Sequence, residues 1–179
     1  MTRLSTVLSF FLAPLLFAST AFASRTAGEN VDDATLGAQA KAALVDDRHV
    51  AAGHINIEVR RGVVQLGGFV DTELEKTSAV AAVRRIHGVG SVQDAMVVLP
   101  GTRSLGQTLD DTKIQTQLKA RLADIEGLAA AQRINTEVRQ GHVLLSGFVG
   151  HDSQRTQAGS IARGINGVKA VHNKISVAR

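Results

Sequence analysis

The stretch Gly-Val-Val-Gln-Leu-Gly-Gly-Phe-Val at residues 62–70 decides the fold of this chain, because its pattern occurs a second time. Residues 141–149 read Gly-His-Val-Leu-Leu-Ser-Gly-Phe-Val, so Gly-x-Val-x-Leu-x-Gly-x-Val recurs after 79 positions. The same shift relates Ile55-Asn56 to Ile134-Asn135, Ile86-x-Gly88-Val89 to Ile165-x-Gly167-Val168, and Val92 to Val171. Upstream, residues 31–33 match residues 109–111 with a shift of 78. A duplication of this length predicts two copies of one domain.

Each copy has the hydrophobic pattern of a helix, two strands, a second helix and a last strand. We expect the first helices to begin at Asp32 or Asp33 and at Asp110 or Asp111, where a carboxylate caps the helix. Apolar residues then recur with helical spacing. They are Leu36, Ala40, Ala43 and Leu44 in the first copy, and Ile114, Leu118 and Leu122 in the second.

The first strand alternates cleanly, with Ile55, Ile57 and Val59 on one face. Six glycines in matching positions of the two copies have structural roles. One pair supplies a positive φ that closes a β-hairpin, one lies inside the second strand where a helix approaches or a bulge forms, and one ends the second helix as its C′ residue. These pairs are Gly62 and Gly141, Gly68 and Gly147, and Gly88 and Gly167.

These elements predict an α+β fold of two tandem α-β-β-α-β domains, each a three-stranded sheet with two helices on one face. A strand–helix–strand crossover is right-handed, which places both helices on that face. The domains span residues 31–99 and 109–179. The linker between them, residues 100–108, is short, so we expect a defined mutual packing. Strand order does not follow from the sequence.

The N-terminus has the features of an export signal. A basic residue, an apolar run and the small residues Ala21 and Ala23 predict a signal peptide over residues 1–23, cleaved after Ala23. A retained signal anchor is the alternative. The mature chain then starts with a tail, residues 24–30, and its expected address is the periplasm. The chain has no cysteine, which excludes disulfides, a thiol nucleophile and a lipid-modified N-terminal cysteine.

Charge separates the two copies more than any motif does. Residues 24–105 contain nine Lys/Arg and ten Asp/Glu, a net charge of −1, whereas residues 106–179 contain ten and six, a net charge of +4. Only the second copy is expected to attract an anionic surface. The histidines at 49, 54, 87, 142, 151 and 172 form no helical zinc-binding pair. No nucleophile motif or phosphate-binding loop is present, so the sequence predicts no enzyme, no metal and no cofactor.

The double pattern resembles the BON domain of bacterial osmotic-stress and nodulation proteins. It is carried by the motif at 62–70 and 141–149, followed by Gly88-Val89-x-x-Val92-x-Asp94-x-Met96-x-Val98 and Gly167-Val168-x-x-Val171-x-Asn173-x-Ile175-x-Val177. The chain looks like the dual-BON envelope proteins, which include an osmotically inducible periplasmic branch and an outer-membrane lipoprotein branch.

The resemblance implies a non-enzymatic module that associates with anionic phospholipid surfaces and supports envelope integrity under osmotic stress. In the lipoprotein branch, the first helix of the second domain is the proposed lipid contact. The matching residues here are Lys113, Ile114, Gln117, Lys119 and Arg121. The absence of tryptophan and tyrosine removes the usual aromatic anchors, so binding would rest on peripheral, non-covalent attraction. Two alternatives remain open: a chaperone-like or protein-interaction module for envelope proteins, and small-ligand binding. We expect no nucleic-acid partner.

Overall fold

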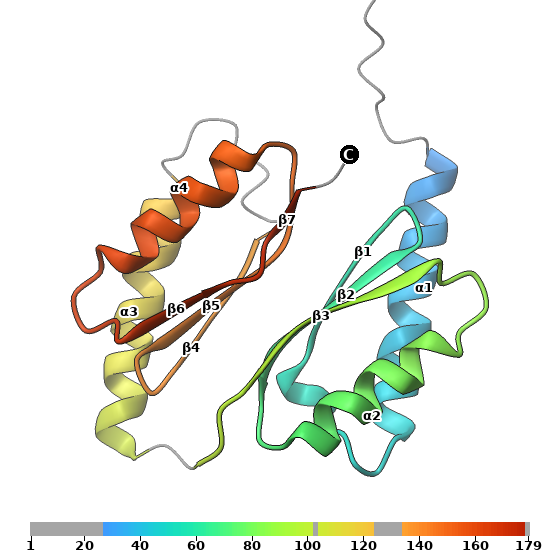
Figure 1. Cartoon of the computed structure of the whole chain (residues 1–179), viewed down its shortest axis with the longest axis horizontal. Helices are drawn as coiled ribbons and strands as arrows, with labels where there is room; N and C mark the ends of the chain where they lie inside the picture. The colour runs from blue at the N-terminus through green and yellow to red at the C-terminus, as the bar shows by residue number, and fades with distance from the viewer. Residues whose placement is uncertain (1–26, 102–103, 124–133, 178–179) are drawn as a thin grey trace, which may run out of the picture.

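The computed structural model describes residues 27–101, 104–123 and 134–177 of the chain. The expected signal peptide and its cleavage site after Ala23 lie outside the described residues. Two domains of the same α+β architecture follow one another along the chain, as the repeat predicts (Figure 1). Helix α1 already begins at Ala27, inside the segment expected as an N-terminal tail.

The first domain has a three-stranded sheet in which β2 is the central strand. Strand β1 pairs with β2 antiparallel, and β3 pairs with β2 parallel after the crossover through α2. The elements are α1 (Ala27–Asp46), the 3-10 helix η1 (Ala52–His54), β1 (Asn56–Arg60), β2 (Val63–Val70), α2 (Glu73–Arg84) and β3 (Ser91–Val98).

The second domain repeats this topology with its last strand divided in two. Its elements are α3 (Leu105–Ala123), β4 (Ile134–Arg139), β5 (His142–Val149), α4 (Asp152–Arg163), β6 (Ala170–Asn173) and β7 (Ser176–Val177). The Lys174 amide still donates to the Leu145 carbonyl at 2.7 Å, so the interrupted strand stays beside β5. The expected sheet of three strands therefore has four strands here, because the third is broken.

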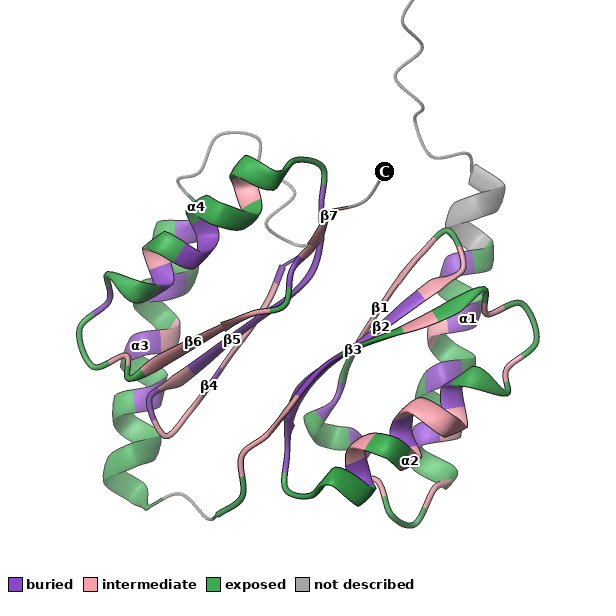
Figure 2. Ribbon diagram, in the orientation of Figure 1, coloured by how far each residue is buried: buried purple, intermediate pink, exposed green. Residues whose placement is uncertain are grey.

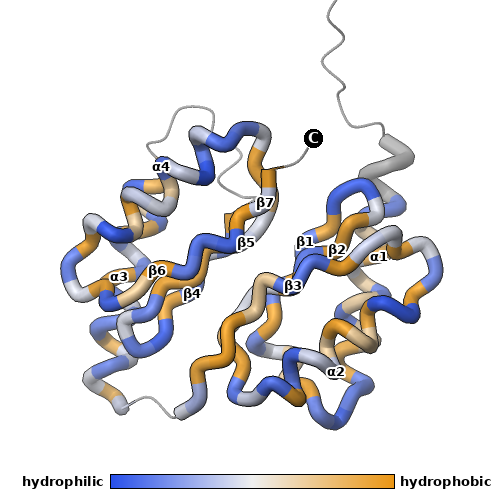
Figure 3. Tube along the Cα trace, in the orientation of Figure 1, coloured by the Kyte–Doolittle hydropathy of each residue, from blue (hydrophilic) through white to orange (hydrophobic). Residues whose placement is uncertain are grey.

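The helices of each domain cover one face of their own sheet, as predicted, and bury their apolar sides against it (Figure 2). Helices and strands alternate between hydrophilic and hydrophobic residues along the chain (Figure 3). The expected stripes form the cores: Leu44 and Leu66 are fully buried in the first domain, and Leu118 and Leu145 in the second. Burial of these side chains from water is the main stabilising term in each domain.

A buried aspartate fixes the hairpin turn of each domain. The Asp33 carboxylate accepts hydrogen bonds from the Arg61 amide at 2.9 Å and the Gly62 amide at 3.1 Å. Both turn residues have positive φ, 50° for Arg61 and 73° for Gly62, which gives the backbone twist of a two-residue hairpin loop. The prediction for Gly62 is confirmed. The cap prediction for Asp33 is wrong, because α1 begins at Ala27 and leaves Asp33 within the helix.

The second domain repeats this arrangement. Asp111 accepts from the Gln140 and Gly141 amides, each at 2.8 Å, and Gly141 has a φ of 79°. Helix α3 begins at Leu105, inside the expected linker, and its cap is Ser104. The Ser104 hydroxyl accepts from the Gln107 amide at 3.3 Å, and the Gln107 side chain accepts from the Ser104 amide at 2.9 Å. The cap expected at Asp110 or Asp111 is therefore wrong, because both lie within α3 and this capping box begins the helix earlier.

The remaining glycines differ in part from their predicted roles. Gly68 (φ 152°) lies against the backbone carbonyl of His54 in η1, so a short 3-10 turn approaches the strand there instead of a long helix. Gly88 (φ 90°) and Gly167 (φ 92°) lie beyond the C′ positions, since α2 ends at Arg84 and α4 ends at Arg163. An added Cβ at Gly167 would come within 3.3 Å of Ile114, so this turn packs directly on α3.

The two sheets face each other, and the helices lie on the outer sides of the molecule (Figure 1). Consequently β2 and β5 are buried on both faces, although the sequence predicts burial of only one. Gly67 has no room for a side chain because Ser146 of the second domain lies against it. Phe69 and Leu144 are also buried on this inner face. The expected defined packing of the domains is confirmed.

Polar contacts fix the register between the sheets. Gln65 is buried, and its amide nitrogen donates to the Lys174 carbonyl at 3.2 Å and to the Ser176 hydroxyl at 3.0 Å. Its carbonyl oxygen accepts from the Gly147 amide. Arg139 reaches the first domain as well, with 2.6 Å between its Nη2 and Asp71 Oδ1. Because buried polar groups are costly when unpaired, these bonds favour one mutual arrangement.

Candidate functional site

Helix α3, which carries all five residues of the predicted site, turns one side toward the core of its domain. Ile114 is 4% exposed and packs with Leu118 and Leu122 in that core. These three residues are therefore core residues, as their helical spacing predicts. Ile114 is a core residue, while Lys113, Gln117, Lys119 and Arg121 are exposed.

The opposite side of α3 presents two exposed leucines that the sequence analysis missed. Leu105 is 88% exposed and Leu109 is 65% exposed. They are four residues apart and therefore lie on one side of the helix. They fell within or beside the expected linker, because Gly106 indicated a loop. Their spacing is the signal that could have found them, once Ser104 is taken as the cap.

Three cations stand on the exposed surface of the same helix. Lys113 follows Leu109 by four residues, so a positive charge adjoins the leucine pair. Within the described ranges, no ion pair joins Lys113, Lys119 or Arg121 to a carboxylate. The helix thus combines an exposed apolar pair with three cations that form no ion pair within the described residues.

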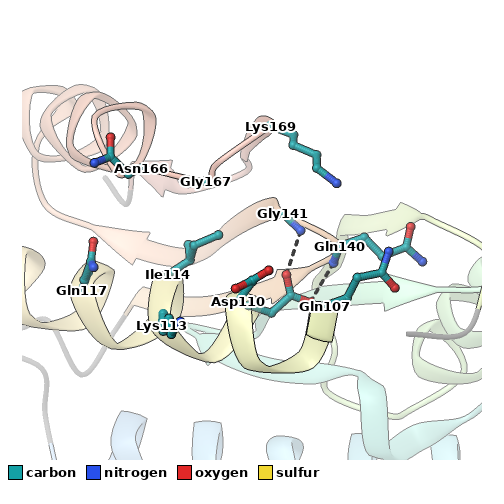
Figure 4. A pocket seen from close by; sticks show the side chains of 11 residues that line it. Gln107, Asp110, Lys113, Ile114, Gln117, Gln140, Gly141, Asn166, Gly167 and Lys169 are labelled. Carbon is teal, nitrogen blue, oxygen red and sulfur yellow. Dashed lines mark hydrogen bonds between the residues drawn. The ribbon is translucent and has the colours of Figure 1, made fainter. Parts of the chain in front are cut away.

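A pocket of about 430 Å³ lies along α3, where the helix carries Lys113, Ile114 and Gln117 (Figure 4). It lies between the helix, the β4–β5 turn and the α4–β6 turn. The lining residues are Gln107, Asp110, Asp111, Lys113, Ile114, Gln117, Gln140, Gly141, Asn166, Gly167 and Lys169. Because three segments far apart in the sequence form it, no local motif predicts it.

The chemistry of the pocket is that of a polar ligand site with two cations. The Asp111 carboxylate is occupied by the Gln140 and Gly141 amides, as the dashed lines in Figure 4 show. The Gln107 side-chain oxygen accepts from the Ser104 amide, and the Gln140 side-chain nitrogen donates to the Gly101 carbonyl at 3.5 Å. The other groups that can meet a ligand include the ammonium groups of Lys113 and Lys169, the side-chain amides at 117 and 166, and the Asp110 carboxylate. Amides and ammonium groups donate hydrogen bonds to phosphate and hydroxyl oxygens.

The structure brings together only part of the predicted site. Lys113, Ile114 and Gln117 line the pocket. Arg121 follows Gln117 by four residues and lies on the same side of α3, one turn further along. Lys119 is two residues from Gln117 and points away from the pocket, on another side of the helix. The sequence analysis missed Lys169, Gln140 and Asn166, which come from the two turns.

Other candidate chemistry is sparse in the part of the chain that the structure describes. Among these residues there is no cluster of three or more histidine, cysteine or acidic side chains that could hold a metal ion. The His172 pKa is lowered, first by burial and then by the nearby charges of His142 and Lys174. Over the same described ranges, no helix has both the length and the apolar character needed to cross a bilayer.

Known proteins resemble this chain in sequence. The sequence matches the BON domain over residues 32–100 and again over residues 110–179. It is 32% identical to osmotically-inducible protein Y of Escherichia coli over 149 residues, which covers 83% of this chain and 74% of that protein. It is also 32% identical to the outer membrane lipoprotein DolP of Haemophilus influenzae over 148 residues, 82% of this chain and 75% of that protein.

Among solved structures, it is similar to CdsD, a structural protein of the type III secretion system of Chlamydia trachomatis. That similarity has a TM-score of 0.33 and 12% sequence identity, over 82% of this chain and 63% of that one.

Proposed function

This chain belongs to the BON domain family, and from that premise we propose that it is a non-enzymatic periplasmic module that binds anionic phospholipid surfaces and supports the envelope under osmotic stress. Its relatives include an osmotically inducible protein and an outer membrane lipoprotein, which supports an envelope role. Helix α3 of the second domain is the proposed contact.

The exposed leucine pair of α3 carries this proposal. Leu105 and Leu109 would insert shallowly among the lipid headgroups, while Lys113, Lys119 and Arg121 are attracted to the negative surface. Each cation near such a surface contributes about 1 kcal/mol, and the apolar insertion adds to it. With no tryptophan or tyrosine in the chain, binding is weak, peripheral and sensitive to salt.

The pocket beside α3 fits the polar part of the same ligand. Lys113 lies between the leucine pair and the pocket, so a lipid whose chains meet Leu109 would present its phosphate near Lys113 and Lys169. The amides of Gln117, Gln140 and Asn166 line the pocket beyond. This arrangement favours a headgroup with hydroxyl oxygens, such as that of phosphatidylglycerol or cardiolipin.

Flotation of the mature chain with lipid vesicles tests the proposal. We expect binding to phosphatidylglycerol and cardiolipin vesicles at low salt, loss of binding as salt rises, and weaker binding to phosphatidylcholine. Leu105→Ser combined with Leu109→Ser should reduce binding without lowering thermal stability, because both side chains are already exposed. Leu74→Ser, at an exposed leucine of the first domain, is the matched control. No binding to anionic vesicles at low salt would refute the proposal.

The alternative, a protein-interaction module, is less well supported at the β3 and β6 edges of the two sheets. In β3 the Asp94 carboxylate accepts from the Met96 amide at 3.0 Å, and beside β6 Asn173 accepts from the Ile175 amide at 3.3 Å. The Leu99 amide donates inward to Val70, so the Met96 amide points to the free edge. A side chain that satisfies an edge amide hinders the addition of a partner strand.

A further inference from the structure

A histidine pair lies on the inner face of the second domain, where that domain meets the first. In the β5–β6 register, His172 pairs with Leu144, and His142 is two residues before Leu144. All three side chains therefore point to the same face of the sheet. The Phe69 ring of the first domain meets the His172 ring edge-on, with centroids 6.1 Å apart and planes at 82°.

The two imidazole rings are joined by a hydrogen bond. His142 Nδ1 and His172 Nε2 are 3.3 Å apart, the ring planes differ by 11°, and the centroids are 5.6 Å apart. Such a bond requires one nitrogen to donate and the other to accept. If both rings are protonated, both nitrogens carry hydrogen, the bond is lost, and two positive charges face each other.

The surroundings of His172 favour its neutral form. Lys174 adds positive charge beside His172. Arg139 stands opposite His142 in the β4–β5 register and also binds the first domain through Asp71 and the Phe69 carbonyl. Burial, His142 and Lys174 together lower the His172 pKa below 6.5. Of these three causes, only burial, the largest, can change when the domains part, because His142 and Lys174 belong to the same domain as His172.

We propose that His142 and His172 form an acid-sensitive latch between the two domains, which holds them together at neutral pH and loosens as the pair is protonated. The sign follows from linkage. When the domains separate, His172 regains solvent, its pKa rises toward 6.5, and the separated form takes up the proton more readily. The latch is complete above pH 6.5 and weakens below it. Each pKa unit between the two forms changes their ratio by up to about tenfold.

The first domain supplies matched substitutions for the test. With the shift of 79, Val63 stands where the second copy has His142, and Gln93 stands where it has His172. His142→Val with His172→Gln thus removes both imidazole rings and installs residues that the same fold already accepts. His87→Gln, at an exposed histidine in the α2–β3 turn, is the control for general effects of losing a histidine.

The distance between the domains can be measured directly, because the chain has no cysteine. Ala38→Cys in α1 and Ala120→Cys in α3 place spin labels at exposed positions on the two outer sides of the molecule. The distance between the two labels is measured in the mature chain with a metal chelator present. We expect the fraction of long label-to-label distances to rise as pH falls from about 7.5 to about 5, across the range where histidine titrates. The His87→Gln variant should behave like its parent, and the double histidine variant should show no such rise.

A second readout needs no substitution of the pair. The Gly147 amide donates across the interface to Gln65, whereas the Gly90 amide donates to Gly62 within the first domain. The readout is the rate of amide hydrogen–deuterium exchange, corrected for the intrinsic rate at each pH. Below pH 6.5 this rate should rise for the Gly147 amide relative to the Gly90 amide. Unchanged distances and unchanged relative exchange in the parent would overturn the latch, and so would an equal acid response in the double variant. Neither measurement involves lipid, so the outcome is independent of the proposed function.

Discussion

The first helices of the two domains fold alike and differ in what they expose. With the shift of 78, Thr35 and Ala43 of α1 correspond to Lys113 and Arg121 of α3. Lys41 corresponds to Lys119, yet Lys41 is already bound within its own domain, with 2.5 Å between its Nζ and the Ala52 carbonyl. The cores of the two copies are similar, whereas exposed lysine and arginine side chains are more numerous on α3 than on the described part of α1. This difference is the reason why we propose the membrane contact for the second domain.

The sharpest contrast within α3 is between its buried and exposed leucines. Leu118→Ala should lower the free energy of unfolding by about 2–5 kcal/mol, because it opens a cavity in a closely packed core. Leu109→Ala should change stability by less than about 0.5 kcal/mol, since that side chain is 65% exposed. Chemical denaturation of both variants measures the difference. Equal losses would contradict the assignment of the two sides of the helix.

Both domains share a buried aspartate that binds the hairpin turn, and substitution of this aspartate tests its role in each. Asp33→Ala and Asp111→Ala should each cost about 2–3 kcal/mol, because each leaves two turn amides without their charged acceptor. The neighbouring exposed residues, Asp32→Ala and Asp110→Ala, are the controls and should have small effects. A control that costs as much as its neighbour would show that the hairpin bonds are not the cause.

Sequence predicts those parts of this molecule that depend on local pattern. The core stripe through Leu118 and the positive φ of Gly62 and Gly141 follow from periodicity and turn chemistry. The role of Asp33 could not be predicted, because its partners at Arg61 and Gly62 lie far along the chain and meet it only in the folded domain.

The second buried face of the sheets was missed for a related reason. Gln65 and Ser146 look like solvent-facing strand positions, and only the other copy of the domain covers them. Part of the candidate site was predicted by resemblance, through Lys113 and Gln117 on α3. Its other half, with Lys169 and Asn166, arises from turns that pack beside the helix, and Leu105 was missed because Gly106 indicated a loop.

Exchanging single pocket residues for their counterparts in the first copy sharpens the comparison further. Lys113→Thr and Lys169→Gly each remove one cation from the pocket and install the residue of the other domain. We expect each to weaken binding to anionic vesicles by about 1 kcal/mol, or roughly fivefold. The effects should shrink as salt rises. If neither variant changes the affinity for anionic vesicles, the pocket is not part of the lipid-binding site.

The most direct test of the division between the domains is reversal of exposed positive charges in each, followed by flotation with phosphatidylglycerol vesicles at low salt. Lys113→Glu, Lys119→Glu and Arg121→Glu together should weaken binding by at least about 100-fold, because three attractions of about 1 kcal/mol are lost and replaced by repulsion. Arg84→Glu with Arg85→Glu, on the exposed end of α2 and the residue after it, should leave most binding intact. Equal loss from both sets, or no loss from the α3 set, would contradict the assignment of the membrane surface to the second domain.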